Sequence, residues 1–239
     1  MLAELRDLLL IDIETVACEA SYSQLSERLR AHWSRKSSFL KREEGDTDED
    51  LFHQKAGIYA EFGKIIVVAV GRYVEVAGGK TGLQTKCFYS DDERSLLEEV
   101  RAFLDHGSAT LKLVAHNGKE FDFPYLSRRM LIHGMSLPAA LNLSGRKPWE
   151  VPHLDTLELW KFGDYKHFTS LDLLATVFDI PSSKNDMDGS MVNHVYYHEN
   201  GLRRIAQYCV SDVVVLAQLF LRMKGHPLME EAGIVKCEI

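Results

Sequence analysis

The sequence predicts an α/β protein in which a mixed five-stranded sheet is flanked by helices. Short apolar or β-branched runs bounded by polar residues recur along the first two thirds of the chain, and amphipathic runs with helical spacing follow several of them. A content of 46% hydrophobic and 26% charged residues is ordinary for a globular protein, and 239 residues can bury a sizeable core. We therefore expect a single domain over residues 1–239.

The elements can be placed in chain order. Apolar runs predict strands over residues 8–13, 63–73, 85–89, 111–117 and 151–157. Ser90 followed by Glu93 forms a capping-box pattern, which predicts a helix through about residue 105. Further helices are expected in the segment closed by Gly134 and over 169–178, 189–199 and 202–223. The polar stretch 19–61, with its acidic run EEGDTDED, is expected to be a partly helical insertion with a mobile tip.

Charge and cysteine content narrow the class of protein. A net charge of −7 excludes a protein held on nucleic acid by its overall field, so any such contact must come from local patches. The four cysteines are scattered without a CxxC pair, which favours a reducing cytoplasm over a disulfide framework or zinc ribbon. No run approaches the roughly 20 apolar residues of a membrane span. The N-terminus lacks a signal-peptide layout. We expect a cytoplasmic protein without a membrane partner.

Two carboxylates end the first predicted strand. Asp12 and Glu14 lie two residues apart in LLLIDIET, so on a strand they share one face while Ile11 and Ile13 share the other. Two carboxylates side by side at the end of an apolar strand are costly unless a cation lies between them. For this pair alone, a divalent-cation site and a strand that merely ends at the surface both remain open.

A second cluster follows the fourth predicted strand, in HNGKEFDFPYLSRRM. Asn117 ends the strand, and Asp122 lies between Phe121 and Phe123. A carboxylate between aromatic rings suits a site that holds a metal and stacks a base. Alternatively, Asp122 only caps the helix before Pro124 and the rings belong to the core.

A third cluster, YCVSD, lies in the last predicted helix. Tyr208 and Asp212 are four residues apart, so the phenol and the carboxylate point the same way. Beside them runs an apolar stripe of Ile205, Cys209, Val213, Leu216 and Phe220. Taken alone, the pair is also consistent with a packed tyrosine and a solvated carboxylate.

Together the clusters resemble the motifs of the DEDD superfamily of 3′–5′ exonucleases. Their order and spacing match DxE, N-x4-D and YxxxD, which here comprise Asp12, Glu14, Asn117, Asp122, Tyr208 and Asp212. The segment NGKEFDFPYLSRR is similar to the FDxPYLxxR signature of proofreading domains in family-B DNA polymerases, and PSSKNDMDGS (181–190) resembles stand-alone bacterial relatives. The resemblance spans nearly the whole chain and implies a ribonuclease H-like fold. A tyrosine four residues before the last aspartate indicates the tyrosine subclass.

The resemblance implies a 3′–5′ exonuclease that uses two divalent cations, Mg²⁺ or Mn²⁺. The implied metal ligands are Asp12, Glu14, Asp122 and Asp212, with Tyr208 as a fifth catalytic residue that orients the attacking water. The implied contacts to the substrate are Thr15, Asn117 and Phe123. Candidates for phosphate contacts, each equally consistent with plain surface, are Lys119, Arg128, Arg129 and Lys166. The implied partner is the 3′ end of single-stranded DNA, and a separate polymerase or repair protein could be another.

Several alternatives stay open. Nothing in the motifs reads a 2′-hydroxyl, so an exoribonuclease fits as well. A non-catalytic nucleic-acid-binding protein of the same fold is a second alternative, although all four carboxylates and the tyrosine are present. Asp155, in HLDTLEL, is expected to support the site from a strand end or to touch substrate or metal. His194 and His198 have a spacing that can hold zinc, but an exposed helix face explains them too.

Overall fold

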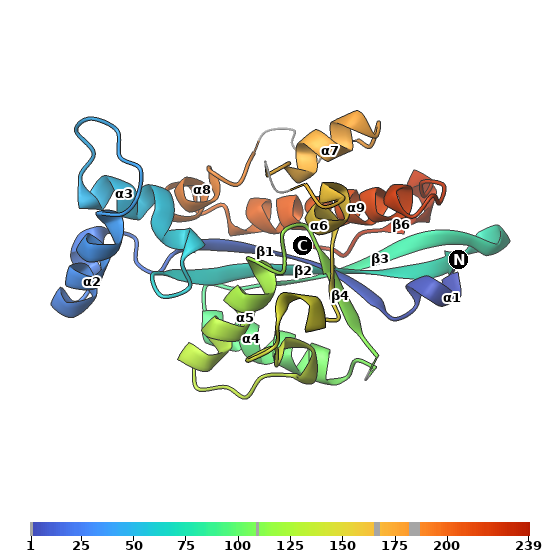
Figure 1. The fold of residues 1–239 in the computed structure, drawn as a ribbon, viewed down its shortest axis with the longest axis horizontal. Helices are drawn as coiled ribbons and strands as arrows, with labels where there is room; N and C mark the ends of the chain where they lie inside the picture. The colour runs from blue at the N-terminus through green and yellow to red at the C-terminus, as the bar shows by residue number, and fades with distance from the viewer. Residues whose placement is uncertain (1, 109, 165–167, 182–186) are drawn as a thin grey trace.

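The computed structural model describes residues 2–108, 110–164, 168–181 and 187–239. Its centre is a mixed six-stranded sheet with the strand order β5-β4-β1-β2-β3-β6 (Figure 1). The strands are β1 (Leu8–Ala17), β2 (Gly63–Val76), β3 (Lys80–Tyr89), β4 (Lys112–Ala115), β5 (Leu154–Asp155) and β6 (Ile234–Val235). β1 pairs antiparallel with β2 and parallel with β4. The predicted mixed α/β sheet with the first strand inside it is confirmed.

The predicted count of five strands is wrong by one. β6 pairs parallel with the edge of β3, where Leu83 lies opposite Ile234. A strand of two residues is too short to show an alternating pattern, so only its long-range pairing reveals it. β2 and β3 meet in a tight turn at Gly78 and Gly79, which have φ of 77° and 70° that side-chain-bearing residues rarely adopt.

Helices cover both faces of the sheet (Figure 1). They are α1 (Leu2–Leu5), α2 (Glu27–Ser37), α3 (Asp48–Lys55), α4 (Glu93–Asp105), α5 (Asp122–Ile132), α6 (Thr156–Lys161), α7 (Leu171–Val177), α8 (Val192–Glu199) and α9 (Leu202–Met223). The helix expected after residue 90 is α4, but the predicted capping box is wrong. Asp92 caps α4 by accepting from the Arg94 N–H, whereas Glu93 turns inward and is 6% exposed.

The alternation of β1 divides the core between the two faces. Leu8, Leu10 and Val16 pack in the cluster that contains α9, whereas Leu9, Ile11 and Ile13 pack in the cluster that contains α4 and α5. Asp12 and Glu14 have the same parity as Leu8 and Leu10, so the backbone aims them toward α9. The predicted separation of the two carboxylates from the neighbouring isoleucines is confirmed.

The stretch 19–61 packs beyond the end of β1, where Figure 1 shows α2 and α3 at one end of the sheet. It has a small core of its own, in which Trp33 is fully buried against Phe52 and Phe62 at ring distances of 5.4 and 5.0 Å. A short 3-10 turn, η2 (Ala56–Ile58), connects α3 back toward β2 and contacts β1.

The final helix, α9, is by length and composition apolar enough to cross a membrane, contrary to the expectation from the sequence. The apolar window of α9 has a mean hydropathy of 1.4 and is 67% buried inside the protein. Its buried face packs on β1, β2 and β3, and the central helix of a sheet protein has the same composition. Burial against the sheet therefore accounts for its apolar character.

Candidate active site

β1 supplies the first two acids of the candidate site. Asp12 lies opposite Ala69 of β2 and Glu14 lies opposite Val67, immediately before an irregularity in the β1–β2 register. Glu14 is 8% exposed and Asp12 is half-buried. The irregularity after Glu14 shifts the following residue, Thr15, relative to β2, and such breaks commonly re-aim side chains beside functional sites.

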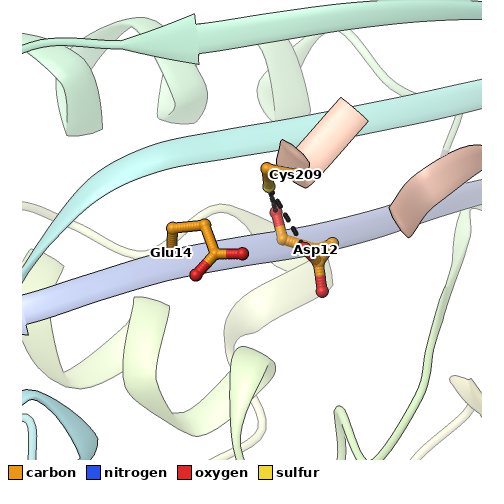
Figure 2. Close-up of side chains that lie close together, drawn as sticks. All are labelled: Asp12, Glu14 and Cys209. Atoms are coloured by element: carbon orange, nitrogen blue, oxygen red, sulfur yellow. Dashed lines mark hydrogen bonds between the residues drawn. The ribbon is translucent and has the colours of Figure 1, made fainter. Parts of the chain in front are cut away.

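α9 brings three more side chains to the same face. Figure 2 shows the thiol of Cys209 against Asp12, with Glu14 beside them on β1. The Cys209 Sγ donates to Asp12 Oδ2 at 3.1 Å and lies 3.4 Å from the Asp12 carbonyl oxygen. Asp12, Glu14 and Cys209 each offer one atom that could bind a metal ion, and these three atoms lie within 4.8 Å of one another. One residue before Cys209, Tyr208 hydrogen-bonds to Asp212 one turn further along α9.

α5 supplies the fourth carboxylate. Asp122 is the first residue of α5, is 4% exposed, and is hydrogen-bonded to the backbone at Ile13 of β1. The cap position belongs to Phe121, which makes no side-chain capping bond. The alternative in which Asp122 only caps the helix is therefore wrong: its carboxylate faces β1.

The electrostatics show that the four carboxylates form one cluster. Burial raises the pKa of Asp12 well above its usual value, and the charges of Asp212, Glu14 and Asp122 raise it further. The pKa of Glu14 is raised in the same way, by burial and then by Asp212 and Asp122. Burial, with a contribution from Asp155, raises the pKa of Asp122 to about 7. Burial therefore raises the pKa values of Asp12, Glu14 and Asp122 alike, and neighbouring carboxylates add to the effect.

The donor set fits divalent metal ions. Four carboxylates from β1, α5 and α9 lie near enough to interact electrostatically, and hard divalent cations prefer oxygen ligands. The charged neighbours that raise the pKa values of Asp12 and Glu14 are themselves carboxylates. A cation held between them would replace this mutual repulsion by attraction.

Tyr208 is a proton donor at the edge of this cluster. Burial raises its pKa far above the ordinary value, and the neighbouring Asp212 and Glu14 charges raise it further. The phenol therefore keeps its proton across the physiological range.

Asp155 stabilises the loop that leads to Asp122. Its carboxylate accepts the backbone N–H groups of Asn117 at 2.9 Å, Lys119 at 3.1 Å and Leu157 at 2.9 Å. These bonds fix the loop between β4 and α5, in which Asn117 has a left-handed φ of 63°. The carboxylate is already committed to N–H donors, which matches the expected supporting role and not that of a ligand.

The residues expected to touch the substrate divide into two groups. Thr15 and Asn117 flank the carboxylates and are half-buried, and the Thr15 hydroxyl donates to the Gly57 carbonyl oxygen at 2.8 Å. Phe123 must be corrected: it is fully buried, its ring lies 5.0 Å from His153, and it belongs to the core beneath α5. A ring without an exposed face cannot stack on a base in this conformation. The neighbouring Phe121 is only half-buried.

Two of the basic residues expected to contact phosphate are committed elsewhere. Arg129 is 8% exposed and forms a buried ion pair with Glu93, so it is no surface contact. Lys119 forms an ion pair with Glu158 at 2.6 Å. Arg128 is exposed, and Lys166 lies outside the described residues.

His194 and His198 do not join a metal site in the part of the chain that the structure describes. Their rings stack 4.9 Å apart on an exposed face of α8, and His194 lies 3.7 Å from Glu199. Among the described residues, the group whose ligand atoms converge is the one formed by Asp12, Glu14 and Cys209.

The sequence did not identify Cys209 and His153 as residues that contact the site or the strand next to it. Cys209 was assigned to the apolar stripe of the last helix, and nothing in the sequence indicated that its thiol meets Asp12. His153 is 2% exposed, accepts the Leu113 N–H at 3.1 Å and lies 2.6 Å from the Ala140 carbonyl oxygen. Burial lowers the pKa of His153, so it is a neutral bridge that holds β4. Both contacts join residues far apart in the chain.

Comparison with known proteins bears on the fold and on the family. No curated protein matches the sequence. Among solved structures, the family B DNA polymerase from the hyperthermophilic archaeon Pyrobaculum calidifontis matches over 90% of this chain, with a TM-score of 0.53 and 15% identity. The chain spans 24% of the length of that polymerase, and the likeness shows a shared fold, an α/β fold of the ribonuclease H-like kind. Residues 60–231, well over half of the chain, match a family described as predicted 3′–5′ exonuclease related to the exonuclease domain of PolB. The chain belongs to this family of predicted 3′–5′ exonucleases.

Proposed function

We propose that the protein is a divalent-cation-dependent exonuclease that removes nucleotides from the 3′ end of single-stranded DNA, and that it belongs to the tyrosine subclass. The observation that carries the proposal is the electrostatic interaction among the carboxylates of Asp12, Glu14, Asp122 and Asp212, which come from three elements, with Tyr208 bonded to the last of them. The family membership supports the 3′–5′ direction.

The proposed cations are two Mg²⁺ or Mn²⁺ ions held by these four carboxylates. When bound, such ions lower the pKa of a water molecule and stabilise the charge on the leaving oxygen of a phosphodiester. The protein holds the ligands in place. β1 and α9 carry Asp12 and Asp212, and the hydrogen bond from Ile13 fixes the carboxylate of Asp122. Pre-set ligands lose little freedom when the reaction begins.

Tyr208 has a distinct part in this proposal. Its raised pKa excludes the phenol as a general base near neutral pH. Its O–H group, already bonded to Asp212, can instead orient the attacking water by a hydrogen bond. The water's proton must then pass to solvent or to a carboxylate of the cluster.

The preference for a single strand follows from burial. Glu14 and Asp122 are 8% and 4% exposed, so little of either carboxylate is open to a bulky substrate. A free strand end can reach such carboxylates, whereas a paired end must first unstack and unpair. The net charge of −7 fits a mode of binding that depends on local contacts more than on the overall field.

The test is a degradation assay on 5′-labelled substrates: single-stranded DNA, duplex DNA with a 3′ mismatch, and RNA, each with Mg²⁺, with Mn²⁺ and with chelator. We expect a ladder of products shortened stepwise from the 3′ end, fastest on single-stranded DNA and absent with chelator. Faster shortening of RNA would make the protein an exoribonuclease. Internal cuts, or no cleavage of any substrate with either ion, would contradict the proposal.

A further inference from the structure

A hollow with an apolar floor and basic side chains at its rim lies between α2 and residues 61–62, in and beside the insertion 19–61. It has a volume of about 450 Å³ and is lined by Leu29, His32, Arg35, Lys36, Phe39, Glu61 and Phe62. Phe39 follows directly after the end of α2 and is 80% exposed, which is unusual for so large an apolar side chain.

The charge of this segment differs from that of the whole protein. Residues 28–42 contain six Lys and Arg and no Asp or Glu, in a chain of net charge −7. His32, Arg35 and Lys36 come from neighbouring turns of α2, so they line one side of the helix. Lys36 already lies over the Tyr59 ring at 4.1 Å, and Glu61 is the acidic residue in the lining.

The hollow is built on a fixed helix. Trp33, on the inner face of α2, is fully buried and donates its indole N–H to the Asp48 carbonyl oxygen at 2.8 Å. The Ser37 hydroxyl donates to the Asp48 carboxylate at 2.7 Å, and Arg42 pairs with the same carboxylate. The basic side chains on the outer face therefore project from a scaffold held by α3.

The hollow adjoins the end of β1, the strand that carries Asp12 and Glu14. Beyond the end of β1, the Cys18 N–H donates to the carbonyl oxygen of Phe62, which lines the hollow, at 2.9 Å. Cys18 follows Glu14 by four residues, which is about 13 Å along an extended strand. A nucleic-acid strand whose 3′ end reaches Glu14 covers that distance within a few nucleotides, since each base step spans ~3.4 Å or more.

We propose that this face of α2 binds the single-stranded substrate upstream of its 3′ end, with a base stacked on Phe39 and phosphates held by Arg35 and His32. The inference rests on the proposed function and assigns to the insertion the binding of the single-stranded nucleic acid. Residues 28–42 lie outside the part of the chain that matches the exonuclease family, which begins at residue 60. Aromatic stacking together with phosphate contacts is the usual chemistry of binding to single strands.

The test measures the Kd of (dT)12 and of (dT)3 for Phe39→Ala and Arg35→Ala. Each protein also carries Asp212→Asn, and gels after binding verify that the strands are intact. We expect Phe39→Ala to raise the Kd of (dT)12 by roughly tenfold, the range of one lost base stack. Arg35→Ala should raise the Kd of (dT)12 and should reduce the slope of log K against log salt by ~0.7. The ratio of the (dT)12 and (dT)3 affinities should fall in both variants.

Matched controls are Ile132→Ala and Arg222→Ala, which change an exposed apolar and an exposed basic residue at the ends of α5 and α9. They should bind (dT)12 as the parent protein does. Equal (dT)12 affinity in Phe39→Ala and the parent, or an equal loss for (dT)3, would overturn the inference. Because binding is measured without cleavage, the result is independent of whether the wild-type protein degrades DNA. Failure of the proposed function would show separately, in the degradation assay.

Discussion

Glu93 and the pair of Asp12 and Glu14 are acids whose pKa values are shifted in opposite directions. Glu93, at the start of α4, is 6% exposed and accepts from Arg129 Nε at 2.8 Å and from the Ile65 N–H at 2.7 Å, and lies 2.7 Å from the His133 ring. Burial acts to raise the pKa of Glu93, but these partners, Arg129 first, hold it below the usual value. At Asp12 and Glu14, burial and neighbouring carboxylates act in the same direction and raise the pKa values.

The difference separates an acid that stabilises the fold from acids that we propose to bind cations. Glu93 meets a guanidinium and hydrogen-bond donors supplied by the protein, and it ties α4 to α5 and β2. The cluster around Asp12 gathers like charges in one buried place, which lowers the free energy of unfolding unless a cation joins them. Strongly perturbed carboxylates of this kind are typical of functional sites.

The largest expected effect is on catalysis. Asp12→Asn should lower the rate of 3′-end hydrolysis by at least about 10²–10³-fold, because it removes a charged ligand from the centre of the cluster. In chelator at pH 8, the same variant should unfold at a higher urea concentration than wild type, since it removes buried repulsion. Glu98→Gln, on the exposed face of α4, is the control and should change neither quantity appreciably. A wild-type rate for Asp12→Asn would refute the site.

Glu93→Gln should have the largest effect on stability. Removing one partner of a buried ion pair leaves Arg129 without its counter-charge, at a cost of about 3–5 kcal/mol. Urea unfolding at pH 7.5 checks this value against Glu98→Gln, whose exposed pair with Arg94 contributes under ~1 kcal/mol. Equal stability of both variants would show that the buried pair of Glu93 and Arg129 does not stabilise the fold as described.

The stability of the metal-free protein should depend on pH in part through the titration of Asp122. Its pKa is about 7 in the folded protein, against about 3.9 in an unfolded chain. Between these values the folded state binds the extra proton, so stability declines as the pH rises through this window. From pH 5 to pH 8 we expect Asp122 alone to contribute a loss of about 2–3 kcal/mol in chelator, and the raised pKa values of Asp12 and Glu14 act in the same direction. Asp122→Asn should show a shallower decline, and millimolar Mn²⁺ should restore stability at pH 8. A stability that rises from pH 5 to pH 8 equally in both proteins would contradict the assignment.

Tyr208→Phe should have the smallest of these effects. Loss of one orienting hydrogen bond predicts a fall in kcat of about 10–100-fold with little change in KM. Because the pKa of Tyr208 is raised, its ionisation should not limit the wild-type rate up to pH 9.5. A basic limb present in the wild-type pH–rate profile and absent from that of Tyr208→Phe would show that the phenol titrates as a base.

The sequence predicted the parts of the site that depend on local periodicity. Asp12 and Glu14 share a face because strand residues alternate, and Tyr208 and Asp212 share one because helix residues repeat every turn. It failed for Phe123, because the angle at which a helix meets the sheet decides whether residue 122 or 123 faces the site. It also failed for Glu93, whose partner Arg129 lies 36 residues away. Such long-range contacts arise only when the elements pack.

The most direct test of the central claim is the binding of Mn²⁺ measured by calorimetry at pH 8, with thymidine 5′-monophosphate present as the product of the proposed reaction. Wild-type protein and Glu98→Gln should bind the ion with the same affinity, and Asp12→Asn should lose at least one site. The account would be contradicted if wild-type protein took up no Mn²⁺, or if Asp12→Asn bound it as tightly and in the same amount.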